Sequence, residues 1–336
     1  MDPLILIVIF LSFFICFLVM PFWIRKCREV GLLWSDMNKR GNPKNVASSG
    51  GIVVVLAFIL GVLLYIAFKT FIIKDGVDIS VQIFSLLTVI LILGLIGLVD
   101  DLLGWAHGGL SARTRVFLGF FAAIPLIVIN AGVSTMELPF IGTVTWGIWY
   151  PLLLIPLGVS GCAVTYNFLA GYNGLEASQG IIVLSALAYV SYVSGVSWLS
   201  VVALCMVAAL FGFWIFNKYP AKVFPGDIMT YPIGALIAGI AILGNIEKVA
   251  AFFFIPYIIE MVLKVRGKLQ KHSFGKPQKD GSLNMPYNKI YGLEHLAIRI
   301  LKKIKPNKKA YEREVVWLIN GFQILVILIG LLLFVW

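Results

Sequence analysis

The stretch ISVQIFSLLTVILILGLIGLV, residues 79–99, contains no charged side chain and is followed directly by Asp100 and Asp101. A helix of about 20 mostly apolar residues crosses the hydrocarbon core of a bilayer. The stretch therefore predicts a membrane-spanning helix. It also raises the question of what chemistry two adjacent carboxylates serve at the end of an apolar segment.

Apolar blocks of this kind recur along the whole chain. Of its 336 residues, 60% are hydrophobic and 13% are charged, which is typical of an integral membrane protein. Ten blocks approach the spanning length: residues 3–24, 50–68, 80–99, 116–131, 147–166, 179–196, 198–216, 229–244, 249–263 and 316–336. We therefore expect an all-α membrane protein with about ten transmembrane helices, forming a single polytopic domain over residues 1–336.

The basic residues predict how the chain is oriented. If alternate loops share a side, 24 of the 27 Lys and Arg residues fall on one side, and Lys69, Lys74 and Lys248 fall on the other. Cationic loops are retained in the cytoplasm, so both termini are expected to face outward. The net charge of +11 is thus first a topology signal. A nucleotide sugar or an anionic lipid is a plausible partner. Nucleic acid is not expected, because the sequence has no module that combines aromatic and basic residues.

The large basic loop at residues 264–315 has internal order. KDGS at residues 279–282 predicts a hairpin with a two-residue turn, because Asp-Gly tolerates positive φ. Apolar residues recur at helical spacing from Leu293 to Ile304, with Arg299, Lys302 and Lys303 among them. This pattern is typical of a basic amphipathic helix lying in the headgroup layer.

Carboxylates gather in the shorter inner loops, at the ends of different spans. They are Asp36, Asp100, Asp101, Glu176 and Asp227. Any one of them alone could be an ordinary helix cap, but together they indicate a site for a divalent cation or a proton. Asp227 follows Pro225-Gly226 and is expected to cap the next helix, where backbone amides favour an anion. Hard oxygen ligands of this kind favour Mg²⁺ over zinc or iron.

Amides and arginines accompany these carboxylates. Asn167 and Asn173 lie beside Gly171 and Gly174, which would let the backbone approach a ligand closely. Arg113 and Arg115 follow the aspartate pair, and they could either bind phosphate or anchor the loop on the inner side. Adjacent helical residues point about 100° apart, so Asp100 and Asp101 are not expected to grip one ion together. We expect the two carboxylates to have different partners, with one of them holding an arginine.

Several segments together resemble the polyprenyl-phosphate N-acetylhexosamine-1-phosphate transferases across essentially the whole chain. They are SDMNK (35–39), GLVDDLLG (97–104), GLSARTR (109–115), NFLAGYNGLEA (167–177) and FNKYPAKVFPGD (216–227). The chain is more similar to the eukaryotic and archaeal branch, which makes dolichyl diphosphate N-acetylglucosamine. Ala170 and Asn173 stand where the bacterial cell-wall branch carries aspartates, and the last loop lacks that branch's histidine cluster.

The resemblance implies transfer of N-acetylglucosamine 1-phosphate from UDP-GlcNAc to a polyprenyl or dolichyl phosphate, with release of UMP. This would be the first step of lipid-linked oligosaccharide assembly for N-glycosylation. The active site would be cytoplasmic, in the cell membrane of a prokaryote or archaeon or in the endoplasmic reticulum of a eukaryote. The resemblance also implies Mg²⁺, with Mn²⁺ as an alternative, and a homodimer.

Site residues follow from the resemblance by position. Catalytic roles fall on Asp100, Asp101, Asp227 and Arg115, and metal binding on Asp227 and Asn167. The nucleotide sugar would contact Asp36, Asn173, Gly174, Glu176, Lys271 and His272. The lipid phosphate would contact Lys39, Arg113, Arg115 and Asn167. Arg115 stands where much of the family has a lysine, and an arginine keeps the charge but could not lend a proton.

Other functions remain open from the sequence. The same chemistry could use another UDP-N-acetylhexosamine for a cell-surface polymer, and the phosphate could attack directly or through an aspartate-bound intermediate. A secondary transporter is the rival from another class. Transporters place ionisable residues near the bilayer midplane, whereas the carboxylates here gather at the inner ends of the spans. A structural scaffold would not explain polar clusters confined to one face.

Overall fold

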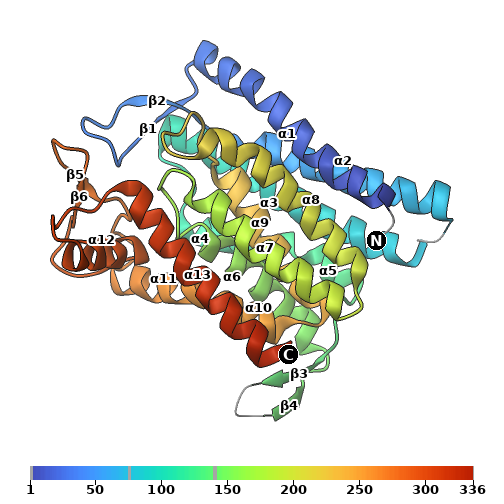
Figure 1. Cartoon of the computed structure of the whole chain (residues 1–336). Coiled ribbons are helices and arrows are strands. Elements are labelled where there is room, and N and C mark those ends of the chain that lie inside the picture. The colour runs from blue at the N-terminus through green and yellow to red at the C-terminus, as the bar shows by residue number, and fades with distance from the viewer. Residues whose placement is uncertain (1–2, 75–76, 139–141, 336) are drawn as a thin grey trace.

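The computed structural model describes residues 3–74, 77–138 and 142–335 and is dominated by helices (Figure 1). The first half contains α1 (Pro3–Val30), β1 (Leu33–Ser35), β2 (Lys44–Ala47), α2 (Gly51–Phe68), η1 (Lys69–Ile73), α3 (Val77–His107), α4 (Ala112–Ala122), α5 (Ile124–Val128), β3 (Thr135–Leu138), β4 (Gly142–Thr145), η2 (Tyr150–Leu154) and α6 (Ile155–Tyr166). The second half contains α7 (Leu175–Val193), α8 (Ser197–Asn217), α9 (Asp227–Gly244), α10 (Glu247–Phe253), α11 (Ile255–Arg266), β5 (Lys276–Pro277), β6 (Leu283–Asn284), α12 (Leu293–Ile304) and α13 (Glu312–Phe334).

Seven of the described helices are long and apolar enough to cross a bilayer. They are α1, α2 with η1, α3, α7, α8, α9 and α13, and they match seven of the ten predicted blocks. The prediction of an all-α integral membrane protein is confirmed at this level. The number of ten spans stays a prediction, because the other three blocks form helices that are broken or distorted.

The broken helices share one local cause. α4 is followed by α5 at Ile124, η2 by α6 at Ile155, and α10 by α11 at Ile255, and a proline occupies the second position of each following helix. Proline fits the first turn of a helix, where its missing N–H group has no partner to lose, but it disrupts a helix interior. The first and third of these blocks are divided near the proline, whereas η2 and α6 form one helix, Tyr150–Tyr166, whose geometry changes there. Average hydropathy does not reveal either feature.

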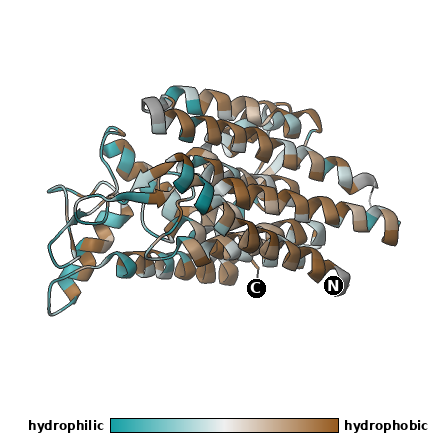
Figure 2. Cartoon of the chain, turned by 90° about the horizontal axis from the view of Figure 1, so that it is seen from above, coloured by the Kyte–Doolittle hydropathy of each residue, from teal (hydrophilic) through white to brown (hydrophobic). Residues whose placement is uncertain are grey.

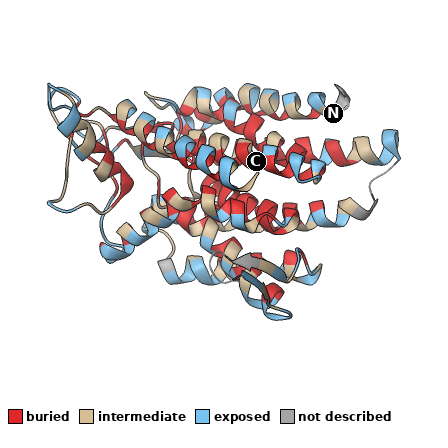
Figure 3. Cartoon of the chain, turned by 60° about the horizontal axis from the view of Figure 1, so that its bottom comes forward, coloured by how far each residue is buried: buried red, intermediate tan, exposed pale blue. Residues whose placement is uncertain are grey.

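Helix α9 lies at the centre of the bundle. Within the candidate spans, 89% of α9 is buried compared with 22% of the window in α1, and buried residues gather on the inner faces of the helices (Figure 3). α9 packs against α3 and α6. A Cβ atom at Gly97 of α3 would lie 2.5 Å from the Asp227 backbone. Small residues let helix backbones approach in this way, and the contact brings the start of α9 to the end of α3.

The polar loops gather at one end of the molecule, which carries β1, β2, β5, β6 and α12, as Figure 2 shows by hydropathy. Both marked chain ends and the β3–β4 hairpin lie toward the opposite end. The loops predicted to share a side therefore do share an end of the bundle. The assignment of that end to the cytoplasm stays a prediction.

The last loop contains the predicted hairpin and helix, with two differences. β5 pairs with β6 in the register Lys276↔Asn284 and Pro277↔Leu283. The connection is longer than the predicted two-residue turn, because β5 ends at Pro277 and β6 begins at Leu283. α12 forms as predicted, but its buried face packs against α11 and α13. Of the predicted apolar stripe, Leu293 and Ala297 are buried and Ile304 is exposed. The position of α12 in the headgroup layer stays a prediction.

Candidate active site

A cavity of about 450 Å³ opens where α3, α4 and α9 meet the polar loops. Its lining residues come from segments 34–48, 100–115, 167–176 and 224–230 and from the large last loop. Its lining includes Trp34, Ser35, Met37, Ser48, Asp100, Asp101, Gly104, Gly108, Gly109, Arg115, Asn167, Ala170, Gly171, Glu176, Phe224, Pro225, Gly226, Asp227, Thr230 and Phe274. Of the charged and amide side chains selected from the sequence, the cavity thus collects Asp100, Asp101, Glu176, Asp227, Arg115 and Asn167.

Asp100 holds Arg115 on one side of the cavity. The Arg115 Nε atom lies 2.7 Å from Asp100 Oδ2, and this carboxylate is almost fully buried. It also accepts hydrogen bonds from the Leu110 N–H group at 2.7 Å and the Tyr231 hydroxyl at 3.2 Å. The expectation that one aspartate of the pair holds an arginine is met by this geometry. The guanidinium is fixed in the cavity wall, where an anionic group of a ligand could reach it.

Asp101 caps helix α9 from the neighbouring helix α3. Its Oδ1 atom accepts a hydrogen bond from the Asp227 N–H group at 2.8 Å, and its Oδ2 atom accepts one from the Ile228 N–H group at 3.4 Å. Unpaired amides at a helix N-terminus favour a negative charge, which Asp101 supplies. The expectation that Asp227 caps α9 is therefore wrong: the cap comes from α3, and the Asp227 side chain lines the cavity.

Gly226 makes this cap possible. Its φ of 72° and ψ of 170° lie in a region that is essentially restricted to glycine. A Cβ atom at this position would overlap the Asp101 carboxylate. The Pro-Gly-Asp sequence is thus needed both for the backbone turn and for the close approach of the Asp101 side chain.

Asn167, Thr230 and Tyr231 complete the wall around Asp227. The Thr230 hydroxyl donates a hydrogen bond to Asn167 Oδ1 at 3.1 Å, and Tyr231 contacts Asp100 as described. Thr230 and Tyr231 were not selected from the sequence. The available signal was their spacing, because residues three and four positions after Asp227 lie on the same face of a helix.

The donor set fits Mg²⁺. The cavity presents four carboxylates, from Asp100, Asp101, Glu176 and Asp227, and the Asn167 amide, with Arg115 supplying one positive charge. Across the described part of the chain, no group of three or more His, Cys, Asp or Glu residues is arranged to hold a metal. Mg²⁺ in phosphoryl-transfer sites is commonly bound by one or two carboxylates together with substrate phosphates, so it does not require such a group. Asp227 and Asn167 are suited to this role.

A second polar network lies beside the cavity. The Asn173 side-chain amide donates to Asp36 Oδ2 at 3.2 Å, and its backbone N–H donates to Glu312 Oε1 at 2.8 Å. Lys39 forms ion pairs with Glu312 and, at 3.5 Å, with Asp36. Asp36, Lys39 and Asn173, selected from the sequence, are thus brought together, but they bind one another outside the cavity lining. Glu312 was not selected, since its neighbours in the sequence give no sign of this partnership.

The remaining selected residues lie in different surroundings. Glu176 lines the cavity and accepts a hydrogen bond from the Gly171 N–H group at 2.8 Å. Gly174 packs beneath Trp214 and Lys218. Lys271 and His272 are exposed next to Phe274, which lines the cavity itself. Arg113 lies at an apolar groove on α4, lined further by Val116, Phe117, Phe120, Phe121, Ile124 and Leu269.

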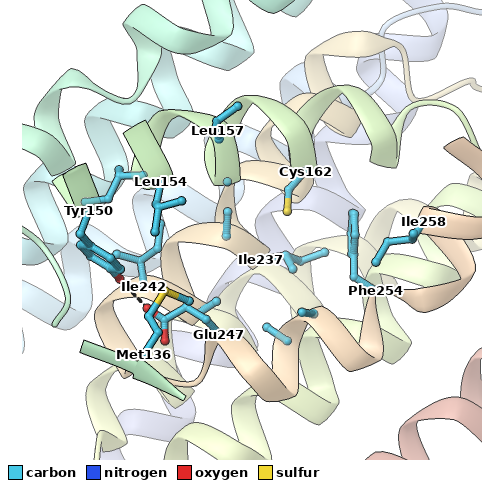
Figure 4. Close-up of a pocket in the computed structure, with 16 residues that line it drawn as sticks. Met136, Tyr150, Leu154, Leu157, Cys162, Ile237, Ile242, Glu247, Phe254 and Ile258 are labelled. Carbon is cyan, nitrogen blue, oxygen red and sulfur yellow. Dashed lines mark hydrogen bonds between the residues drawn. The ribbon is translucent and has the colours of Figure 1, made fainter. Parts of the chain in front are cut away.

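A separate cavity of about 410 Å³ lies between α6, α9, α10 and α11 (Figure 4). Its lining is apolar except at one end, where the Tyr150 hydroxyl donates a hydrogen bond to Glu247. With one carboxylate and no Lys or Arg in its lining, it lacks the groups that would neutralise phosphates. The candidate active site is therefore the acidic cavity at the polar end.

The helical bundle and this cavity define a class of protein: a polytopic membrane protein with an acidic, arginine-containing site at one end. Residues 83–245 match the description Glycosyl transferase family 4. A Saccharolobus solfataricus protein, provisionally named UDP-N-acetylglucosamine–dolichyl-phosphate N-acetylglucosaminephosphotransferase, is 35% identical over 298 residues, covering 88% of both chains. The Dictyostelium discoideum protein of that name is 30% identical over 274 residues, which cover 70% of this chain and 65% of the relative.

The chain belongs to glycosyl transferase family 4. A Streptococcus thermophilus phospho-N-acetylmuramoyl-pentapeptide-transferase is also similar, with 27% identity over 258 residues that cover 74% of this chain and 75% of the relative. The resemblance drawn from the sequence motifs is confirmed. The higher identity to the Saccharolobus and Dictyostelium proteins agrees with the expected archaeal and eukaryotic branch.

Proposed function

We propose that the protein transfers N-acetylglucosamine 1-phosphate from UDP-GlcNAc to a dolichyl or other polyprenyl phosphate, giving polyprenyl diphosphate N-acetylglucosamine and UMP. The observation that carries this proposal is the meeting of Asp100, Asp101, Asp227 and Arg115 in one cavity at the end of a membrane bundle. The names of the Saccharolobus and Dictyostelium relatives support the same reaction.

The reaction joins two anions, so the site must neutralise charge. An oxygen of the acceptor phosphate attacks the β-phosphorus of the donor, a new P–O bond forms, and the bond to the bridging oxygen breaks. The electron pair of that bond leaves with UMP. Arg115, oriented by Asp100, is placed to contact a phosphate in this cavity. Fixed cationic groups in a partly water-excluded site stabilise such a transition state.

The two adjacent aspartates have different tasks in this proposal. Asp100 orients Arg115, and Asp101 fixes the first turn of α9 and with it the position of Asp227. We assign Asp227 and Asn167 as ligands of Mg²⁺, with Mn²⁺ as the alternative. The metal, when bound, would neutralise charge on the donor diphosphate. Direct attack by the acceptor phosphate requires no covalent bond to the enzyme.

The acceptor is expected to reach the cavity from the membrane and the donor from the aqueous side, which we assign to the cytoplasm. The apolar groove on α4 suits the chain of the acceptor. Arg113 lies in that groove, two residues from Arg115, so the groove is close to the phosphate-binding position proposed for Arg115. The second candidate function is the same transfer from another UDP-N-acetylhexosamine as donor, and the similarity to the Streptococcus protein supports it.

The test is turnover by the purified protein with Mg²⁺, dolichyl phosphate and a panel of labelled UDP sugars. We expect UMP release with UDP-GlcNAc to exceed that with other UDP sugars. Asp227→Asn should remove activity and leave the thermal midpoint of unfolding close to that of the parent protein. Asp280→Asn, which changes a half-exposed carboxylate of the β5–β6 hairpin, is the matched control. Full activity of Asp227→Asn would refute the metal assignment, and a preference for another UDP sugar would favour the second candidate.

A further inference from the structure

A buried polar cluster lies behind one wall of the cavity, and the proposed chemistry does not use it. It joins α11, α12 and the segment between α11 and β5. Its members, all nine-tenths or more buried, are Glu260, Lys264, Ser273, Glu294 and His295. Burying polar groups costs free energy unless they are paired, so a cluster of this size requires a structural or functional reason.

Lys264 and Glu260 together link the three parts of this cluster. Its ammonium group forms an ion pair with Glu260 Oε1 at 3.4 Å and donates a hydrogen bond to the Ser273 hydroxyl. Glu260 Oε2 in turn accepts a hydrogen bond from the Leu293 N–H group at 2.6 Å, at the start of α12. The segment that carries Ser273 is therefore tied to α11 through Lys264, and Glu260 ties α11 to α12.

The other two members favour a neutral state. Burial, and next the carboxyl group of Glu260, raise the pKa of Glu294 well above its usual range. Burial, and next the charge of Lys264, lower the pKa of His295 to about 4. The charges of the cluster are then balanced by Glu260 and Lys264. Both side-chain oxygens of Glu294 and His295 Nε2 have no hydrogen-bond partner among the described residues, so the fixed part of the cluster is the paired chain of Glu260, Lys264 and Ser273.

The supported segment reaches the cavity through Phe274, the residue after Ser273. The Phe274 ring packs on Gly171, where a Cβ atom would lie 2.6 Å from the ring. Asn38 secures the same contact from the other side, because its amide donates to Gly171 O at 2.7 Å and its Oδ1 accepts from the Gly275 N–H at 3.2 Å. Phe274 is thus clamped between two loops that line the cavity.

We propose that Lys264 and Ser273 are positioning residues that hold Phe274 as the donor-facing wall of the cavity and so set the affinity for the nucleotide sugar. This inference rests on the proposed function. Phe274 lines the cavity together with Gly171 and Glu176. The polar loops lie at this end of the molecule (Figure 2), so we expect a water-soluble donor to enter here. The ring offers a flat apolar face to a sugar or a base.

The test is a double-mutant cycle between Ser273→Ala and Phe274→Ala with the full-length protein. Loss of the Lys264–Ser273 hydrogen bond should raise the KM for UDP-GlcNAc about three- to tenfold. We expect kcat to stay within about twofold and the KM for dolichyl phosphate to be unchanged. Ser273→Thr, which keeps the hydroxyl, should restore the donor KM. If Ser273 acts through Phe274, Ser273→Ala should have little further effect in the Phe274→Ala background.

Two further measurements separate this inference from the proposed function. Ser282→Ala, in the nearby hairpin, removes a hydroxyl that bonds to Asp280 and should leave the donor KM unchanged. Hydrogen exchange across residues 271–275 should be at least about tenfold faster in Lys264→Met and in Ser273→Ala than in the parent protein. A parent protein that releases no UMP would refute the proposed function. Hydrogen exchange across residues 271–275 would still test whether Lys264 and Ser273 hold Phe274 in place. An unchanged donor KM, additive effects in the cycle or unchanged exchange in both variants would overturn the positioning role.

Discussion

Replacing Gly226 by alanine should damage the site more than any other single methyl group added to a loop. Gly226 has a φ of 72° and a ψ of 170°, where a non-glycine residue is strained by about 1–3 kcal/mol. The added Cβ would also overlap the Asp101 carboxylate, which accepts the Asp227 and Ile228 N–H groups. Each hydrogen bond to a charged acceptor contributes about 1.5–3 kcal/mol.

The expected loss of unfolding free energy for Gly226→Ala is therefore about 3–6 kcal/mol, from the strain together with one or two weakened bonds of the cap. Displacing the first turn of α9 by about 1 Å would move Asp227 and lower turnover about a hundredfold. Both effects have the same physical origin, because Gly226 and Asp101 share the same space.

The assay combines UMP release with thermal unfolding in detergent. Unfolding can be followed by a thiol-reactive dye, since Cys16, Cys27 and Cys205 are buried in the folded state. Gly31→Ala is the matched control, because Gly31 also has positive φ, 74°, but a Cβ atom added there would meet nothing within 4 Å in the described part of the chain. The unfolding free energy of the control should fall only by the cost of backbone strain, about 1–2 kcal/mol. If the two variants lose the same stability and Gly226→Ala keeps full turnover, the cap by Asp101 does not position Asp227.

Three further predictions concern charged and titrating groups. Arg115→Lys keeps a cation beside Asp100 but removes the planar fork, so turnover should fall about tenfold or more, and unchanged kcat would contradict the phosphate role. Glu312→Gln removes the anion that pairs with Lys39, and the unfolding free energy should fall by about 1–3 kcal/mol in a thermal melt. The pKa of His295 is lowered from 6.5 to about 4, so its stabilising effect is present above about pH 6.5 and is lost as the pH falls toward 4. His295→Gln should flatten the dependence of the thermal midpoint on pH in this window, and equal slopes would refute the assignment.

Much of the architecture could be predicted from local patterns. A bilayer imposes a minimum length on any spanning helix, so the apolar block at residues 79–99 could only be interpreted as a span, and α3 covers it. The polar loops that contain the motif segments likewise meet at one end of the bundle. Hydropathy did not reveal the breaks at Pro125 and Pro256 or the change of helix geometry at Pro156, because it averages over residues whose backbone requirements differ.

The residue types of the site could be selected from the sequence, and their partners could not. Asp101 binds the start of α9, 126 positions away, and Asn173 binds Glu312, 139 positions away. Phe274 joined the cavity although the neighbouring Lys271 and His272 had been favoured. Composition and spacing report which groups stand at a membrane surface, because local hydrophobicity determines that. Which group then caps, pairs or stays open to a ligand depends on how closely distant backbones approach, and only the packing of α3 against α9 and of the last loop against residues 167–176 decided it.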